Sequence, residues 1–319
     1  MKFVIILIWA LWLLFYLFGS LSATVIHVPD DQPTIQAGIN AASNGDTVLV
    51  ADGTYTGAGN RDIDFLGKAI VLKSENGPMF TAIDCQGSPG SPQRGLFFHS
   101  AEDSTTIIEG IKIINGCSPE YEIEDQIYAG GAMLCINNSS PLLINCIFEN
   151  NTARGPEFSG YFCAGGAIGC FDKSSPIFIG TDFFDNIVFT DDGIVAGGAI
   201  FIDDSSNLCC KNCNFISNKA TENDSITGIA YGGAIYAQRS NIIIENCMFE
   251  SNSVEFSYQG IIHDNFGYGG AITLVGADSL ICNNCKFESS SIIDNPLNAG
   301  VELYSPLTQY QANIVGAFL

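Results

Sequence analysis

Aromatic and acidic side chains gather in four stretches of the chain that differ in length and composition. These stretches are residues 153–164, 187–196, 219–231 and 253–268. Aromatic rings stack on the C–H faces of sugars, and carboxylates and amides bond to sugar hydroxyls, so this mixture suits glycan binding. The alternative is that the rings pack beneath their own loops. The residues predicted to contact a glycan are Tyr161, Asp191, Asp192, Asp224, Tyr258, His263, Asp264 and Tyr268.

Catalysis on an extracellular polysaccharide is the second interpretation of the same stretches. A lyase needs a base that removes a proton beside a uronate, with calcium or a cation neutralising the carboxylate. A glycoside hydrolase needs two carboxylates, for which Asp191 and Asp192 are available. The scarcity of basic residues favours a non-catalytic protein, with a polysaccharide lyase, hydrolase or epimerase as the alternative. The basic candidates are Arg154, Lys219, Arg239 and His263.

The charge balance excludes one class of partner. The chain has 34 Asp and Glu against 12 Lys and Arg, a formal net charge of -22. Nucleic-acid binding requires clustered basic residues that neutralise phosphates, so no nucleic-acid partner is expected. An acidic surface keeps an exported protein soluble. No cofactor or metal site is predicted, although calcium binding is left open.

A Gly-Gly-Ala motif recurs five times and defines the elements that must position these stretches. It begins at residues 130, 165, 197, 232 and 269, at intervals of 35, 32, 35 and 37 residues. Such a period is typical of solenoids. Apolar residues alternate within each unit, which predicts short strands. The sequence therefore predicts an all-β fold, a parallel β-helix in which stacked coils pair each strand with its equivalents above and below.

A second block follows each Gly-Gly-Ala at nearly constant distance. Stacked coils place equivalent side chains about 4.8 Å apart, so these blocks predict two ladders. Asn suits a turn ladder because its amide bonds from coil to coil and tolerates a left-handed backbone. The predicted inward stack is Phe148, Phe184, Phe215, Phe249 and Phe287. The predicted polar turn ladder is Asn145, Thr181, Asn212, Asn246 and Asn284.

Gly-Gly-Ala-Ile followed by Phe-x-x-Asn resembles the repeat of chlamydial polymorphic outer-membrane proteins. Three units carry the full ending, at 148–151, 215–218 and 249–252, whereas Ile187 and Ser290 stand in place of Asn in the other two. More broadly, the chain resembles the right-handed β-helix, or pectin-lyase-like, superfamily. The resemblance implies one right-handed parallel β-helix for nearly the whole mature chain, and it implies little about activity.

The N-terminal segment predicts export. Residues 3–18 are apolar and uncharged, and small residues follow up to Ala23, which favours a cleaved signal peptide over a retained membrane anchor. The predicted location is secreted or cell-surface, with membrane contact only through this segment if it is retained. The predicted function is adhesion to a glycan or cell-surface partner through the stacked loops. A structural role in an envelope or matrix is a further alternative.

Four regions follow from these features. A short helix that caps the first coil is predicted to begin at Pro33 and Thr34, with Ile35 and Ile39 on one face, and to end by Gly45. The regions are 1–22, the signal peptide or anchor; 23–118, the cap and first coils; 119–295, five regular units; and 296–319, an irregular tail.

The cysteines leave the redox state of the chain open. Cys213, Cys247 and Cys285 are predicted to share one ladder position, with Cys146 two units away and Asp182 between. Stacked equivalents are close enough for disulfides, and small inward thiols also pack as hydrophobic side chains. The sequence favours buried free thiols over disulfides between coils. A metal site is disfavoured because alternate strand residues point in opposite directions.

Overall fold

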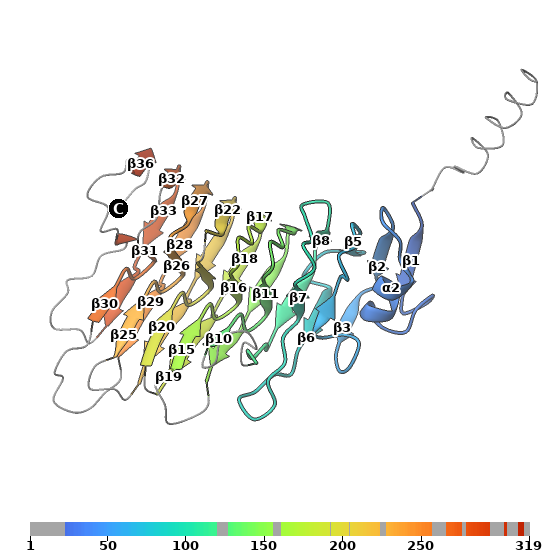
Figure 1. Cartoon of the computed structure of the whole chain (residues 1–319), viewed down its shortest axis with the longest axis horizontal. Coiled ribbons are helices and arrows are strands. Elements are labelled where there is room, and N and C mark those ends of the chain that lie inside the picture. Colours follow the sequence, from blue (N-terminus) through green and yellow to red (C-terminus); the bar gives the residue numbers. More distant parts are fainter. Residues whose placement is uncertain are drawn as a thin grey trace, which may run out of the picture.

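The chain forms an elongated parallel β-solenoid in the computed structural model (Figure 1). The coils turn in the right-handed sense, so the predicted fold class is confirmed. The predicted signal peptide lies outside the described residues. No helix within the described ranges is long and apolar enough to cross a membrane. The structure describes residues 23–119, 127–155, 161–191, 193–203, 205–223, 228–256, 266–275, 279–293, 303–304 and 312–315.

Three of the sheets in the described residues enclose the main core. Sheet A contains β1 (Val25–Val28), β2 (Thr47–Val50), β5 (Val71–Ser74), β8 (Ile107–Glu109), β12 (Leu142–Ile144), β17 (Ile177–Ile179), β22 (Asn207–Lys211), β27 (Asn241–Glu245), β32 (Ser279–Asn283) and β36 (Ala312–Val315). Sheet B contains β3 (Gly53–Tyr55), β6 (Thr81–Asp84), β9 (Lys112–Ile114), β13 (Ile147–Glu149), β18 (Asp182–Phe184), β23 (Asn214–Ile216), β28 (Met248–Glu250) and β33 (Lys286–Glu288). Sheet C contains β4 (Ile63–Asp64), β7 (Leu96–Phe98), β11 (Met133–Cys135), β16 (Ile168–Cys170), β21 (Ile200–Ile202), β26 (Ile235–Gln238), β31 (Ile272–Val275) and β35 (Leu303–Tyr304).

Two shorter sheets form a lobe beside the main solenoid. A regular coil passes through sheets E, C, A, B and D in that order, and a small second core lies between sheets D and E. Sheet D contains β14 (Thr152–Arg154), β19 (Ile187–Thr190), β24 (Lys219–Glu222), β29 (Ser253–Phe256) and β34 (Ser291–Ile293). Sheet E contains β10 (Ile127–Ala129), β15 (Tyr161–Ala164), β20 (Gly193–Ala196), β25 (Ile229–Tyr231) and β30 (Phe266–Tyr268).

The Gly-Gly pair of each repeat forms the neck between the main core and the lobe. Gly197 has a φ of +71°, which an L side chain rarely adopts. A Cβ on Gly198 would lie 2.0 Å from the carbonyl oxygen of Gly233 and 2.5 Å from the backbone nitrogen of Lys219. Lys219 begins β24, so glycine lets sheet D pass directly behind the turn from sheet E to sheet C. The equivalent close approaches occur at Gly131, Gly166 and Gly233.

The predicted phenylalanine stack is present, with one member corrected. In the pairing of β13 with β18, Phe148 lies opposite Phe183, and Phe184 instead lies opposite Glu149 on the outer face. The second unit has two adjacent Phe residues, and the turn before them fixes which one faces inward. Successive ring centroids of Phe148, Phe183, Phe215, Phe249 and Phe287 are 5.3, 4.7, 4.7 and 4.9 Å apart.

The same one-residue shift corrects two other ladders. Gly180, with a φ of +59°, occupies the left-handed turn position that Thr181 was predicted to hold. Thr181 instead stands with the cysteines, where Asp182 was predicted. The Asn part of the turn ladder is confirmed, because Asn284 Nδ2 donates to Asn246 Oδ1 at 2.8 Å and Asn246 Nδ2 donates to Asn212 Oδ1 at 3.2 Å.

A second asparagine ladder is fully buried where sheet B turns into sheet D. The side-chain amides of Asn151, Asn186 and Asn218 donate to the Oδ1 of the next member, ending at Asn252, over 3.0, 2.9 and 3.0 Å. Each ladder residue is 0% exposed. Once Phe183 is placed in the stack, Asn186 completes the Phe-x-x-Asn pattern that Ile187 seemed to break. The buried ladder therefore spans four of the five units.

The predicted capping helix is α2 (Ile35–Ala41), which closes the first coil. Thr34 is its N-cap, and the Thr34 hydroxyl accepts a hydrogen bond from the backbone N–H of Ala37. Ile35 and Ile39 are completely buried, as their common face predicts. The helix ends at Ala41, because the backbone of Ala42 is extended. Lys68 Nζ lies 2.8 Å from the carbonyl oxygen of Ile39 and satisfies this end of the helix.

All twelve cysteines are free thiols, and all but Cys209 are buried. Four cysteines and one threonine form the ladder of Cys146, Thr181, Cys213, Cys247 and Cys285, and Thr181 makes the same contact as the thiols. Cys146 Sγ donates to the carbonyl oxygen of Ile144 at 3.4 Å, and Thr181 Oγ1 donates to that of Ile179 at 3.4 Å. A small side chain with a donor therefore suits this corner between sheets A and B.

Alkaline pH should destabilise the fold through its buried thiols. Burial raises the pKa of Cys85, Cys146 and Cys163 to about 12. Above pH 9 these thiols ionise in the unfolded chain and stay protonated in the folded chain, so the free energy of unfolding falls by about 1.4 kcal/mol per pH unit for each thiol. Urea unfolding between pH 8 and pH 11 measures the slope. Cys146→Thr, which places the residue type of Thr181 in the Cys146 coil, should remove the contribution of one thiol to this slope. An unchanged slope would contradict the conclusion that Cys146 stays protonated in the folded chain.

Candidate functional site

The four variable stretches lie together along one side of the solenoid. Each contributes residues to one strand of sheet D and one strand of sheet E, and the strands of sheet E stand in a row in Figure 1. Insertions at one corner of a solenoid stack on one face because each coil repeats the path of the last. The described residues of these stretches therefore form one lobe.

The predicted contact residues are only partly placed by the structure. Asp192, Asp224, Tyr258, His263 and Asp264 lie outside the described residues. Tyr161 begins β15, and its side chain is also outside the described part. Asp191 and Tyr268 are described: Asp191 directly follows β19 of sheet D, and Tyr268 ends β30 of sheet E.

Asp191 is held in an ion pair on the outer side of sheet D. Its Oδ2 lies 3.1 Å from Arg154 Nη2, and the Arg154 guanidinium lies 4.5 Å from the ring centroid of Phe189. Lys219 pairs with Glu255 at 3.0 Å and Arg239 with Asp203 at 2.9 Å, whereas His263 lies outside the described residues. Because these charges neutralise one another, Arg154 and Lys219 are poorly placed to act as a general base.

A hydrophobic cluster fills the corner between the outer face of sheet C and sheet E. Alternate residues of sheet C face opposite sides, so Cys135 enters the main core and Leu134 enters this corner. The cluster is partly exposed along its rim. This corner cluster comprises Ala129, Leu134, Ile136, Ala164, Phe171, Ala196, Phe201 and Tyr236, with Phe97, Ile127, Phe162, Tyr231 and Val275 partly buried against it.

The aromatic rings of the corner cluster form a band along the solenoid axis. Phe201 stacks on Tyr236 with centroids 5.4 Å apart, and Phe162 meets Phe201 edge-on at 5.3 Å. Tyr231 lies 5.1 Å from Tyr236. The band continues to the predicted residue Tyr268, which stacks on Tyr231 at 5.3 Å. One predicted contact residue thus joins the band, whereas Asp191 does not.

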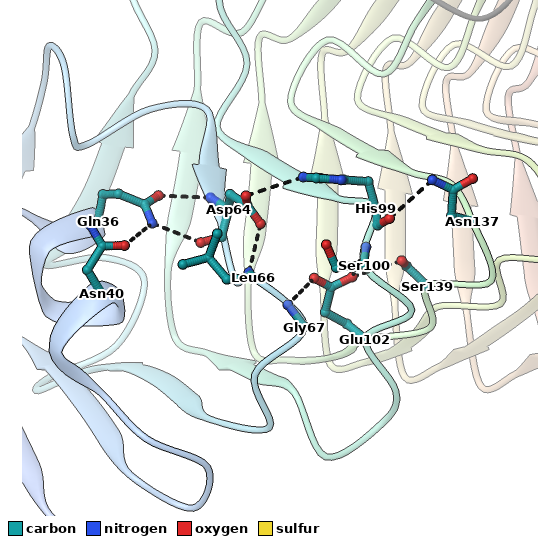
Figure 2. Close-up of polar contacts among 10 residues, drawn as sticks. All are labelled: Gln36, Asn40, Asp64, Leu66, Gly67, His99, Ser100, Glu102, Asn137 and Ser139. Atoms are coloured by element: carbon teal, nitrogen blue, oxygen red, sulfur yellow. Dashed lines mark hydrogen bonds and ion pairs between the residues drawn. The ribbon is translucent and has the colours of Figure 1, made fainter.

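A polar cluster continues the corner toward the N-terminal coils (Figure 2). His99 Nε2 lies 3.3 Å from Asp64 Oδ2, and the His99 ring stacks on Phe97 with centroids 4.3 Å apart. The side chains of His99 and Asp64 are 33% and 25% exposed, so both can be reached from solvent. The side-chain amide of Gln36 pairs with the backbone of Asp64 at 2.9 Å and covers the edge of sheet C.

Glu102, in the same view, has a structural role (Figure 2). It is 1% exposed, and its Oε2 accepts hydrogen bonds from the Ser139 hydroxyl at 2.8 Å and the Ser100 N–H at 3.0 Å. Its Oε1 accepts from the N–H of Gly67 at 3.0 Å. With both oxygens engaged by three coils, Glu102 fixes the turns beside His99.

Polar side chains also lie beside the band near Tyr236. The Tyr236 hydroxyl donates to Gln238 Oε1 at 2.9 Å, and Arg239 Nη2 lies 2.9 Å from Asp203 Oδ1. Hydrogen-bonding groups therefore lie beside the corner cluster in two places, at His99 and Asp64 and at Gln238, Arg239 and Asp203. The combination can bind a ligand with apolar faces and hydroxyl groups.

Sequence reasoning missed Asp64, Phe97 and His99, which precede the first Gly-Gly-Ala. They come together through register, since Asp64 lies opposite Phe97 in the pairing of β4 with β7. The residue after Gly-Gly-Ala-Ile is a usable signal in the later coils, because Phe201 and Tyr236 both occupy that outward position.

The architecture and the family comparison agree on the class of protein. A family model described as right handed beta helix region matches residues 101–314, which is more than half of the chain. The chain belongs to this right-handed β-helix family. No curated protein and no solved structure matches the chain.

Proposed function

We propose that this protein is an exported, non-catalytic β-helix that binds a glycan at a cell surface along the corner cluster. The observation that carries the proposal is the corner cluster, whose aromatic members Phe97, Phe162 and Tyr231 are partly exposed. Polar groups lie beside it at His99–Asp64 and at Arg239–Asp203. Export rests on the apolar segment at 3–18 and the small residues after it.

The ligand best suited to this band is an extended glycan chain that runs along the solenoid. Coils repeat about every 4.8 Å, so the same kinds of contact recur along the axis. Sugar C–H groups can lie on the apolar band, and sugar hydroxyls can bond to side chains such as Gln238 and Asp203. Arg239, Arg154 and Lys219 are engaged by carboxylates, which favours a neutral glycan over a uronate polymer.

Loss of one rim aromatic should weaken glycan binding. Phe162→Ala removes an exposed part of the band, and we expect at least a tenfold rise in the dissociation constant of a glycan selected on an array, because desolvated aromatic contacts dominate such sites. The array is read with and without calcium, and titration calorimetry measures the change. Phe184→Ala is the matched control, since Phe184 is partly exposed on the outer face of sheet B. Equal losses in both variants would contradict the proposal.

The His99–Asp64 pair favours a second candidate function, cleavage of an extracellular polysaccharide. A carboxylate that orients an imidazole can support proton transfer at a solvent-accessible ring nitrogen. Release of unsaturated or reducing sugar ends by the protein, and its loss in His99→Gln, would establish this function. Binding without product, unchanged in His99→Gln, would support the adhesin.

A further inference from the structure

The outer face of sheet A carries two rows of side chains that follow the solenoid axis. Residues such as Leu143 and Phe178 enter the main core, so their neighbours in each strand point outward. The first is an aliphatic row of Val71, Ile107, Leu142, Ile177, Cys209 and Ile243. The second is a mixed row of Lys73, Glu109, Ile144, Ile179, Lys211 and Glu245.

Every side chain in the two rows is partly exposed. Within the mixed row, Lys73 lies 2.9 Å from Glu109 and Lys211 lies 2.9 Å from Glu245. The row therefore reads Lys-Glu, Ile-Ile, Lys-Glu along six successive strands from β5 to β27. An aliphatic row of this length beside it is an apolar strip that a partner can cover.

The charge order of the mixed row is self-complementary when it is reversed. A two-fold axis parallel to the strands, between β12 and β17, places a second copy face to face with its coils in the opposite order. Lys73 then faces Glu245 of the second copy, and Glu109 faces its Lys211. Ile144 faces Ile179 of the second copy, and the aliphatic row faces itself. Such isologous pairing is what a two-fold dimer requires.

We propose that the outer face of sheet A is a homodimer interface with this antiparallel arrangement of two solenoids. Six strands at about 4.8 Å make a strip about 29 Å long. Two such faces bury on the order of 1,000 Å² in total, which is near the lower limit for a specific dimer. The occupant is a second copy because all four charges of the mixed row face opposite charges in that register, while the aliphatic row meets an apolar partner. This interface lies on sheet A, apart from the corner cluster, and is independent of the proposed glycan site.

The test exchanges charges without breaking the ion pair inside one chain. Lys73→Glu with Glu109→Lys keeps the internal pair and the net charge. Across the interface, this swap sets a carboxylate at position 73 against Glu245 and an ammonium group at position 109 against Lys211. Lys211→Glu with Glu245→Lys does the same from the other side. Sedimentation velocity of the purified full-length protein should show a dimer, and each swap should raise its dissociation constant at least about a hundredfold, because like charges across an interface are strongly unfavourable.

Two complementary samples then identify the register. A chain carrying both swaps restores every cross-interface pair, and so does an equimolar mixture of the two single-swap chains; both should dimerise like the wild type. Unchanged circular dichroism in all variants separates loss of association from loss of folding. A wild-type chain that remains monomeric at about 100 µM overturns the proposal. Dimerisation that survives either single swap overturns the proposal too. If the wild type is a monomer that binds phosphatidylcholine vesicles, and Ile179→Lys abolishes this vesicle binding, the face is a membrane-binding surface and the dimer proposal is overturned.

Discussion

Gly198→Ala should destabilise the protein by about 4 kcal/mol or more, because backbone atoms surround the added methyl group. The new Cβ would lie 2.0 Å from the carbonyl oxygen of Gly233 and 2.5 Å from the backbone nitrogen of Lys219. Neither atom belongs to a flexible side chain, so relief requires separation of adjacent coils or of sheet D from the neck. The midpoint of urea unfolding, followed by circular dichroism, measures the loss.

Gly90→Ala is the control for this substitution. A Cβ on Gly90 meets nothing within 4 Å, and no left-handed φ constrains the position. The control should therefore change the free energy of unfolding by less than about 0.5 kcal/mol. If Gly198→Ala unfolded at the same urea concentration as Gly90→Ala, the neck would not be the tight crossing described above.

Asn218→Leu should lower the free energy of unfolding by a similar amount, because it interrupts the buried asparagine ladder at its centre. Asn218 Nδ2 donates to Asn252 Oδ1 at 3.0 Å and to the carbonyl oxygen of Phe183 at 2.9 Å. Its Oδ1 accepts from Asn186 Nδ2 at 2.9 Å and from the Asn186 N–H at 3.2 Å. Leucine fills the volume and leaves these partners in a dry site, where each loss costs about 1–3 kcal/mol and the sum is about 4 kcal/mol or more.

The exposed ladder provides the matched comparison for Asn218→Leu. Asn246 has a φ of +54° and bonds to Asn212 and Asn284 at the solvent-facing turn. Asn246→Gly keeps the left-handed backbone and removes only hydrogen bonds that water can replace, so we expect a loss below about 1 kcal/mol. Comparable unfolding midpoints for the two variants would show that burial is not what makes the inner ladder costly to break.

The local sequence pattern was enough to predict the solenoid. In one coil, however, the prediction was shifted by a single residue. Asp182, Phe183 and Phe184 offer two phenylalanines for one inward position, and a one-residue slip sends every side chain of a strand to the other face. Gly180 settles the choice, since its left-handed φ of +59° occupies the turn where the other units have Asn. That constraint is a property of stacked turns, and it becomes visible when the coils are superimposed.

Sequence alone determined the β-helix, the capping helix at Thr34 and the line of variable segments along one side. These features follow from period-two alternation, capping chemistry and a repeat of constant spacing, all of which act within one coil or between identical coils. The tertiary structure alone decided the corner cluster, the His99–Asp64 pair and the charge order on sheet A. Each depends on which faces of different sheets meet, or on the order of unlike residues across many coils, and neither property is encoded in the spacing of a motif.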